Sequence, residues 1–207
     1  MNNKEIFAKI DYILINSDKP SIEIKQFISD KKFEDEPFVY LKNLKNIKQN
    51  EVHHPEGNVL NHTLLVIDKA SEYRTLSKNK RVFMWAALLH DLGKLTTTKE
   101  RKGKITSYSH DIEGSILARK FLYKLTEDED FINDVCTLVK LHMQPLFYDK
   151  KLSFFNEQEI IDKSDVEEIA LLSLADRLGR GNLSLEKIKN EEDKINNFKN
   201  YLLGKKK

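Results

Sequence analysis

Apolar residues recur every three to four positions along most of the chain, which is the spacing of one buried face of an α-helix. Residues 96–108 are polar, and Gly103 favours a loop or a short hairpin there. The stretch 145–163 is ambiguous. The pattern predicts helices at 4–16, 21–30, 37–48, 59–76, 80–92, 111–125, 128–142, 164–178 and 184–203.

Composition agrees with this pattern, because the chain holds only 7 Gly and 4 Pro among 207 residues. We therefore expect an all-α fold, a helical bundle with a small N-terminal helical extension. The length suits one compact domain with an appendage. We place the extension at residues 1–50, as a helical cap, and the main domain at residues 51–207.

Charge and cysteine content exclude several classes of protein. Lys and Arg number 35 against 33 Asp and Glu, so a net charge of +2 argues against a protein that wraps a polyanion. The Lys-rich stretches 94–104 and 204–207 are typical of solvated surface. The single cysteine, Cys136, excludes an intramolecular disulfide and a cysteine-rich zinc site. The N-terminus lacks the apolar core of a secretory signal, and no stretch reaches the length of a membrane span, so we expect a cytoplasmic protein without membrane contact.

The tripeptide His90-Asp91-Leu92 ends the most apolar stretch of the chain, residues 82–89. A carboxylate and an imidazole that enter a core are costly unless something compensates them. Asp176 likewise closes the apolar stretch 171–175. Buried aspartate is rare without a partner, so two such cases favour a shared cation.

The chain supplies further donors of the same kind, each within or at the end of a predicted helix. The candidate metal ligands are His62, His90, Asp91, His110, His142 and Asp176. Nitrogen and oxygen donors without thiolate suit divalent manganese, nickel, cobalt, iron or zinc, with magnesium as a further candidate. Neighbouring helical residues point about 100° apart, so His90 and Asp91 can address different cations. A carboxylate can bridge two cations, which a histidine cannot.

The order His62, His90-Asp91, Asp176 resembles the HD superfamily of metal-dependent phosphohydrolases. The likeness extends to the HD domain of bacterial CCA-adding tRNA nucleotidyltransferases over roughly residues 41–181. The stretches that carry it are 44–49, 54–59, 62–63, 87–94, 108–110 and 174–181. The resemblance implies an all-helical HD domain with metals between its helices. It makes His62, His90, Asp91 and Asp176 the core ligands and assigns His110 and His142 to a second metal, with Asp91 as the bridge.

A nucleotidyltransferase head would need a glycine-rich strand and turn with paired acidic ligands, and residues 1–50 contain none. We therefore expect no nucleotide addition, but an HD phosphohydrolase module at 51–207 behind its helical cap. The resemblance implies 2′,3′-cyclic phosphodiesterase or phosphatase activity on nucleotides or RNA ends. The near-neutral charge favours a small nucleotide or an RNA-terminal phosphate over an extended nucleic-acid footprint.

For this reaction we expect Asp91 and Lys94 to be catalytic. Asp91 would bind the metals that activate a water molecule without a protein base. The Lys94 ammonium would stabilise the negative charge that develops on the phosphoryl oxygens. The expected substrate-binding residues are Lys94, Arg180, Arg177, Glu56 and His54. Each also has a plain structural interpretation: a lysine favoured by a helix end, surface salt bridges, and a packed loop at 53–57. His54 or Glu56 would protonate a leaving oxygen or orient a ligand histidine, and His53 is a weaker candidate.

Three alternatives stay open at this point. The first is a mononuclear HD 5′-nucleotidase that uses only His62, His90, Asp91 and Asp176. The second is a di-iron HD oxygenase with the same ligands. The third is a degenerate module that binds RNA or a protein. The sequence leaves the oligomeric state undetermined.

Overall fold

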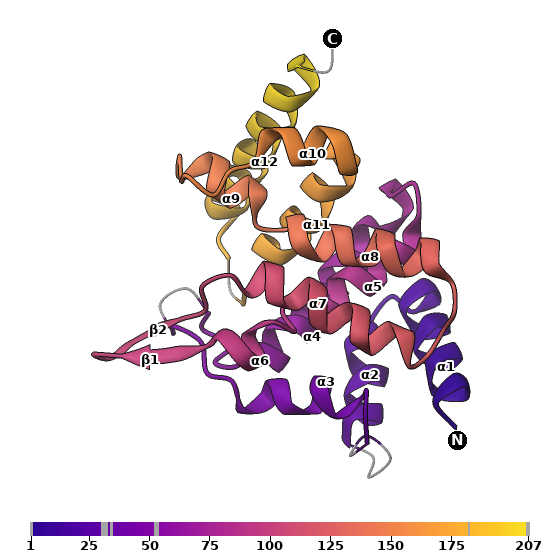
Figure 1. Cartoon of the computed structure of the whole chain (residues 1–207). Helices are drawn as coiled ribbons and strands as arrows, with labels where there is room; N and C mark the ends of the chain where they lie inside the picture. The colour runs from indigo at the N-terminus through magenta and orange to yellow at the C-terminus, as the bar shows by residue number, and fades with distance from the viewer. Residues whose placement is uncertain (1, 30–32, 34, 52–53, 182, 206–207) are drawn as a thin grey trace.

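The computed structural model describes residues 2–29, 33, 35–51, 54–181 and 183–205, and most of them are helical (Figure 1). The predicted all-α class is therefore confirmed. The helices are α1 (Asn3–Asn16), α2 (Pro20–Ser29), α3 (Val39–Asn43), α4 (Val59–Tyr73), α5 (Lys80–Leu89), α6 (Lys94–Thr97), α7 (His110–Tyr123), α8 (Glu129–Leu141), α9 (Gln144–Asp149), α10 (Glu157–Lys163), α11 (Val166–Leu178) and α12 (Leu185–Lys205). Two 3-10 turns, η2 (Leu44–Asn46) and η3 (Arg74–Leu76), extend α3 and α4. Among the described helices, none is both long and apolar enough to cross a membrane.

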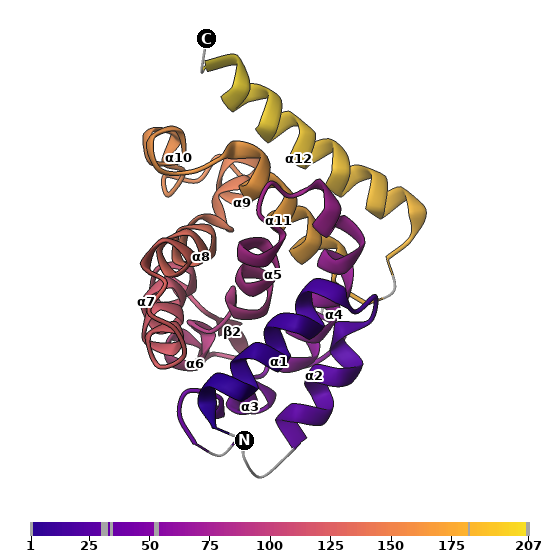
Figure 2. The ribbon, with the colours of Figure 1, turned by 90° about the vertical axis from the view of Figure 1, so that its right-hand side faces the viewer.

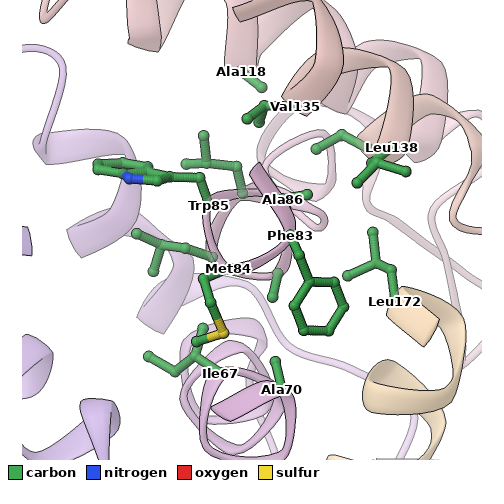
Figure 3. Packing of buried hydrophobic residues seen from close by; sticks show 14 of the residues in the cluster. Ile67, Ala70, Phe83, Met84, Trp85, Ala86, Ala118, Val135, Leu138 and Leu172 are labelled. Carbon is green, nitrogen blue, oxygen red and sulfur yellow. The ribbon is translucent and has the colours of Figure 1, made fainter. Parts of the chain in front are cut away.

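Helix α5 lies at the centre of the bundle (Figure 2). Its residues from Val82 to Leu89 are all buried, as expected for a helix that is apolar on every side. Trp85, Phe83 and Met84 pack among side chains of α4, α7, α8 and α11 (Figure 3). Because α5 is held on all sides, its C-terminal end is a fixed point for the residues that follow it.

The N-terminal helices α1, α2 and α3 cover one side of α4 and α5. Their buried residues belong to the same apolar cluster as α5. The indole Nε1 of Trp85 donates to Asp11 Oδ1 over 2.7 Å, and Arg81 Nε donates to the same oxygen over 2.8 Å. The core is thus continuous across the boundary expected between residues 50 and 51, and that boundary stays a prediction.

The glycine after His90-Asp91-Leu92 corrects one expectation. We expected one helix over 80–92, but α5 ends at Leu89, and Gly93 has an ordinary φ of −62°. A Cβ on Gly93 would lie 2.0 Å from the carbonyl oxygen of His110 and 2.5 Å from the Gly114 nitrogen. Glycine is needed here so that the turn over residues 90–93 can contact the start of α7 directly.

The polar stretch 96–108 forms a short antiparallel hairpin of β1 (Lys99–Arg101) and β2 (Lys104–Thr106). Lys102 and Gly103 in its turn both have positive φ, 50° and 72°, as in the tight turns that suit hairpins. The hairpin projects from the helical body next to α6 and α7 (Figure 1).

Candidate metal centre

The six predicted metal ligands meet in the middle of the bundle, and all six are buried. Each comes from a different place in the fold, except for the neighbours His90 and Asp91 in the turn after α5. The contributing elements are α4 for His62, the start of α7 for His110, the residue after α8 for His142, and the last turn of α11 for Asp176. Packing of α4, α7, α8 and α11 around α5 therefore brings the ligands together.

The carboxylate of Asp91 lies between two groups of histidines. Its Oδ2 is 3.8 Å from His62 Nε2 and 3.4 Å from His90 Nε2, whereas its Oδ1 is 3.6 Å from His110 Nε2. The ligand atoms of His62, His90 and Asp91 lie within 4.8 Å of one another. Those of Asp91, His110 and His142 do so as well. Each group has the donors and the spacing to hold one divalent cation.

Asp176 belongs to the first of these groups. Its Oδ1 lies 2.9 Å from His62 Nε2 and 4.0 Å from His90 Nε2. It therefore completes a set of two imidazoles and two carboxylates, with the second carboxylate from Asp91.

Backbone carbonyls orient three of the four candidate ligand histidines. Nδ1 of His90, His110 and His142 lies 2.8, 2.8 and 2.6 Å from a carbonyl oxygen three residues earlier in the chain. A carbonyl only accepts, so Nδ1 carries the proton and Nε2 keeps a free lone pair. The Nε2 atoms of His90 and His142 are buried and have no hydrogen-bond partner within the described part of the chain. Buried acceptors without partners are costly, and a shared cation would satisfy both, so the residues fit a metal site.

Glu56 lies behind His62, on the side away from the ligand groups. Its Oε1 is 2.9 Å from His62 Nδ1 and 2.9 Å from His54 Nδ1. Burial opposes ionisation of Glu56, but the hydrogen bonds from both histidines outweigh it and lower the pKa of the carboxyl. Burial likewise opposes protonation of His62, but Asp176 and Glu56 outweigh it and raise the pKa of the imidazole. Glu56 thus lies where it can orient His62, one of the two roles expected for it, and its contact with substrate stays a prediction. His53 lies outside the described residues.

The surroundings keep the central carboxylate ionised. Burial alone would raise the pKa of Asp91, but the charge of the neighbouring Lys94 ammonium holds it well below its usual value. Lys94 Nζ is 2.7 Å from Asp91 Oδ2 and donates to Gln49 Oε1 over 2.7 Å. Burial lowers the pKa of His142 to about 3, so this imidazole is neutral near pH 7. Ionised carboxylates and neutral imidazoles are the forms that bind metal cations.

A cavity of about 530 Å³ opens over the ligands, and Asp91, His110, His142 and Asp176 face it. The cationic residues among those that line it are Lys48, Lys94, Lys150, Lys194, Arg177 and Arg180. Arg177 is buried and paired with Glu191 over 2.5 Å. The Nε atom of Arg180 is buried and has no hydrogen-bond partner among the described residues. Arg177 also has a buried nitrogen without a partner. Within the described residues Arg180 forms no ion pair like that of Arg177 with Glu191, so it is the freer of the two to bind an anion. His54 also lines the cavity.

The fold and the centre define an all-helical domain with a buried site of imidazole and carboxylate ligands. The family model of the HD domain matches residues 59–181, which is more than half of the chain. The chain belongs to the HD domain family. Membership implies divalent metal binding and metal-dependent phosphohydrolase chemistry, and the buried His/Asp clusters are consistent with both.

Curated proteins similar to this chain include multifunctional CCA proteins, as the resemblance predicts. That of Actinobacillus pleuropneumoniae serotype 5b (strain L20) is 38% identical over 93 residues, which cover 45% of this chain and 22% of the relative. That of Shewanella frigidimarina (strain NCIMB 400) is 32% identical over 119 residues, which cover 58% and 27%. The chain thus matches less than a third of the length of these relatives.

Proposed function

We propose that this chain is a dinuclear metal-dependent phosphohydrolase that acts on nucleotide or RNA-end phosphoesters, as a 2′,3′-cyclic phosphodiesterase or phosphatase. The observation that carries the proposal is the position of Asp91. Its two oxygens face different groups of histidines, so this one carboxylate is placed to serve both groups. The mononuclear alternative gives no role to His110 and His142, whose Nε2 atoms lie in the second group.

When bound, divalent cations would lower the pKa of water and polarise a phosphoryl group. The chain's own residues then have separate tasks. The four histidines and two aspartates hold the cations, and Glu56 fixes the ring of His62. A residue that holds a ligand histidine in this way keeps the geometry of the metal ligands constant through the reaction.

In this proposal Lys94 and Arg180, which both line the cavity, bind the substrate phosphate. The Lys94 ammonium sits beside Asp91 at the cavity wall, where it can support negative charge that develops on phosphoryl oxygens. Arg180 offers a guanidinium that suits bidentate phosphate binding. A cavity of about 530 Å³ falls within the usual range for small-ligand sites, about 300–1,000 Å³, so it fits a nucleotide or one RNA terminus.

The test begins with chelator-stripped protein, to which manganese, nickel, cobalt, iron(II), zinc or magnesium is added separately. Hydrolysis of bis-p-nitrophenyl phosphate and of 2′,3′-cyclic AMP is measured with each cation. We expect turnover to return with at least one cation and to be lost in Asp91→Ala. Absence of turnover with every cation would refute the phosphohydrolase proposal. Iron in the purified protein together with oxygen uptake and no phosphatase activity would favour the oxygenase alternative.

The number of cations is tested by His142→Ala, with Lys124→Ala on the exposed surface as the matched control. Bound metal is counted by elemental analysis, and activity is measured on the same samples. We expect two cations per chain in the parent and the control, and one in His142→Ala with most activity lost. One cation in all three proteins, with His142→Ala fully active, would support the mononuclear nucleotidase.

A further inference from the structure

The hairpin of β1 and β2 carries like charges on one face. Its register places Arg101 directly opposite Lys104 and Lys99 opposite Thr106. Lys99 and Arg101 are two residues apart on β1, so they point to the same side. Like charges directly across a hairpin destabilise it. A local conflict of this kind is expected where function compensates for it.

Neighbouring side chains do not neutralise these charges. Within the described ranges, the side chains of Lys99, Arg101 and Lys104 form no hydrogen bond or ion pair, and all three residues are exposed. Elsewhere on the surface Arg81, by contrast, is paired with Asp11 over 2.8 Å. Among the residues that the structure describes, the positive charge of the hairpin therefore has no partner in an ion pair.

The same three cations line a cleft of about 650 Å³ beside the hairpin. Tyr108 lines it as well and is 77% exposed, so its ring face is accessible to a ligand. Glu113 is the one carboxylate among the lining residues that the structure describes. Cationic side chains that follow a groove, with an exposed aromatic ring, are typical of surfaces that bind single-stranded nucleic acid.

Strand β2 separates this cleft from the candidate metal centre. Its Lys104 and Thr106 line the outer cleft, whereas Ile105 and the following Ser107 line the cavity over the metal ligands. This alternation is that of a strand whose successive side chains point to opposite faces. A ligand in this outer cleft is thus separated only by β2 from the cavity over the candidate metal ligands.

We infer that the outer face of this hairpin, made of Lys99, Arg101, Lys104 and Tyr108, binds the phosphate backbone of a short single-stranded RNA. The terminal phosphoester of that RNA lies in the metal cavity. The inference rests on the proposed function, because a 2′,3′-cyclic end requires the 2′-hydroxyl of RNA. The three cations can contact about three backbone phosphates. So short a contact is consistent with the near-neutral net charge of the chain.

Binding is tested by fluorescence anisotropy on the protein as purified. The probe is a labelled RNA hexanucleotide with a 3′-hydroxyl end, which offers no terminal phosphoester for hydrolysis. We expect Arg101→Ala/Lys104→Ala to weaken binding and to reduce the slope of log affinity against log salt by about 1.4, or about 0.7 for each phosphate that no longer meets a cation. Glu113→Gln should strengthen binding, because it removes a carboxylate that lines the cleft. Unchanged affinity and slope in the double variant would overturn the inference.

The matched control is Lys120→Ala/Lys124→Ala, which removes two exposed cations at the far end of α7 that line neither cleft. It should bind RNA like the parent, and equally weakened binding in both double variants would show unspecific charge attraction and refute the inference. A DNA hexanucleotide that binds as tightly as the RNA would refute the assignment to RNA. Thermal melting checks folding, and we expect no loss of stability in Arg101→Ala/Lys104→Ala, since a repulsion is removed.

Activity separates this inference from the proposed function. We expect Arg101→Ala/Lys104→Ala to lower kcat/KM for a hexanucleotide with a 2′,3′-cyclic end and to leave kcat/KM for 2′,3′-cyclic AMP unchanged. An equal decrease on both substrates would refute a separate backbone contact. If the parent hydrolyses neither substrate, the proposed function fails, while the anisotropy measurement still decides whether the hairpin binds RNA.

Discussion

Gly93 offers a sharp test of how the metal centre is built. A Cβ at this position would lie 2.0 Å from the carbonyl oxygen of His110, whereas real Cβ contacts below 3.0 Å are essentially absent. In Gly93→Ala the turn and the start of α7 must therefore separate by about 1 Å. Overpacking lowers the free energy of unfolding by about 1–3 kcal/mol. The loss here should lie near the upper value, because the added Cβ meets backbone atoms rather than a movable side chain. Alanine also lowers the conformational entropy of the unfolded chain, which stabilises the folded state by about 0.4–1 kcal/mol. We therefore expect the free energy of unfolding to fall by about 2 kcal/mol.

The assay is urea unfolding of the parent and of three alanine variants, followed by circular dichroism. Gly181→Ala is the control for open space, because nothing lies within 4 Å of its added Cβ. Gly114→Ala is intermediate: its nearest contacts are 3.3 Å, and alanine favours the helix, so the two effects nearly cancel. Calorimetric titration with the activating cation should show weaker binding in Gly93→Ala than in either control, since the shift moves His110 away from Asp91.

Two results would refute this reasoning. If Gly93→Ala is as stable as Gly181→Ala, the close approach of the turn to α7 is wrong. If Gly93→Ala loses stability but binds the cation like the parent, His110 is not held in place by this contact.

Three further changes test other parts of the structure. Glu56→Ala should lower cation affinity about 10- to 100-fold by calorimetry, because His62 loses the carboxylate that orients it, whereas Glu51→Ala at the exposed surface should not. Trp85→Ala should cost about 3–5 kcal/mol in urea unfolding, and a loss below about 1 kcal/mol would contradict the central position of α5. Burial raises the pKa of the Cys136 thiol to about 11, so at pH 8 the thiol is protonated and enclosed. Iodoacetamide should therefore modify Cys136 slowly in the native protein and quickly in urea. Equal modification rates in the two conditions, measured by mass spectrometry, would contradict the burial of this thiol.

Local sequence is enough to predict most helices, because their apolar spacing is a property of each segment alone. The all-apolar stretch 82–89 indicates a fully buried helix, and α5 is one. The apolar environments of Asp91 and Asp176 likewise indicate two buried carboxylates, and in the structure both lie within 4 Å of His62 Nε2.

Features that depend on contacts between distant segments are not predictable in this way. Gly93 suggests a helix cap by its sequence position, and only the nearness of His110 explains why it is glycine. The side of His62 on which Glu56 lies follows from the fold of the 54–57 turn, which no local pattern encodes. The like-charged pair Arg101 and Lys104 becomes visible only with the register of the hairpin, so the sequence by itself favours plain solvated surface for the lysine-rich stretch.

The contact between His62 and Asp176 joins residues 114 positions apart in the chain. We expect contacts between such distant residues to form late in folding, because closing a long segment of chain costs conformational entropy before the contact is made. A cation that needs both residues would then find its site only after the folding barrier has been crossed. The bound cation would leave the folding rate almost unchanged and would lower the unfolding rate instead. The metal centre would therefore make the folded bundle kinetically more stable.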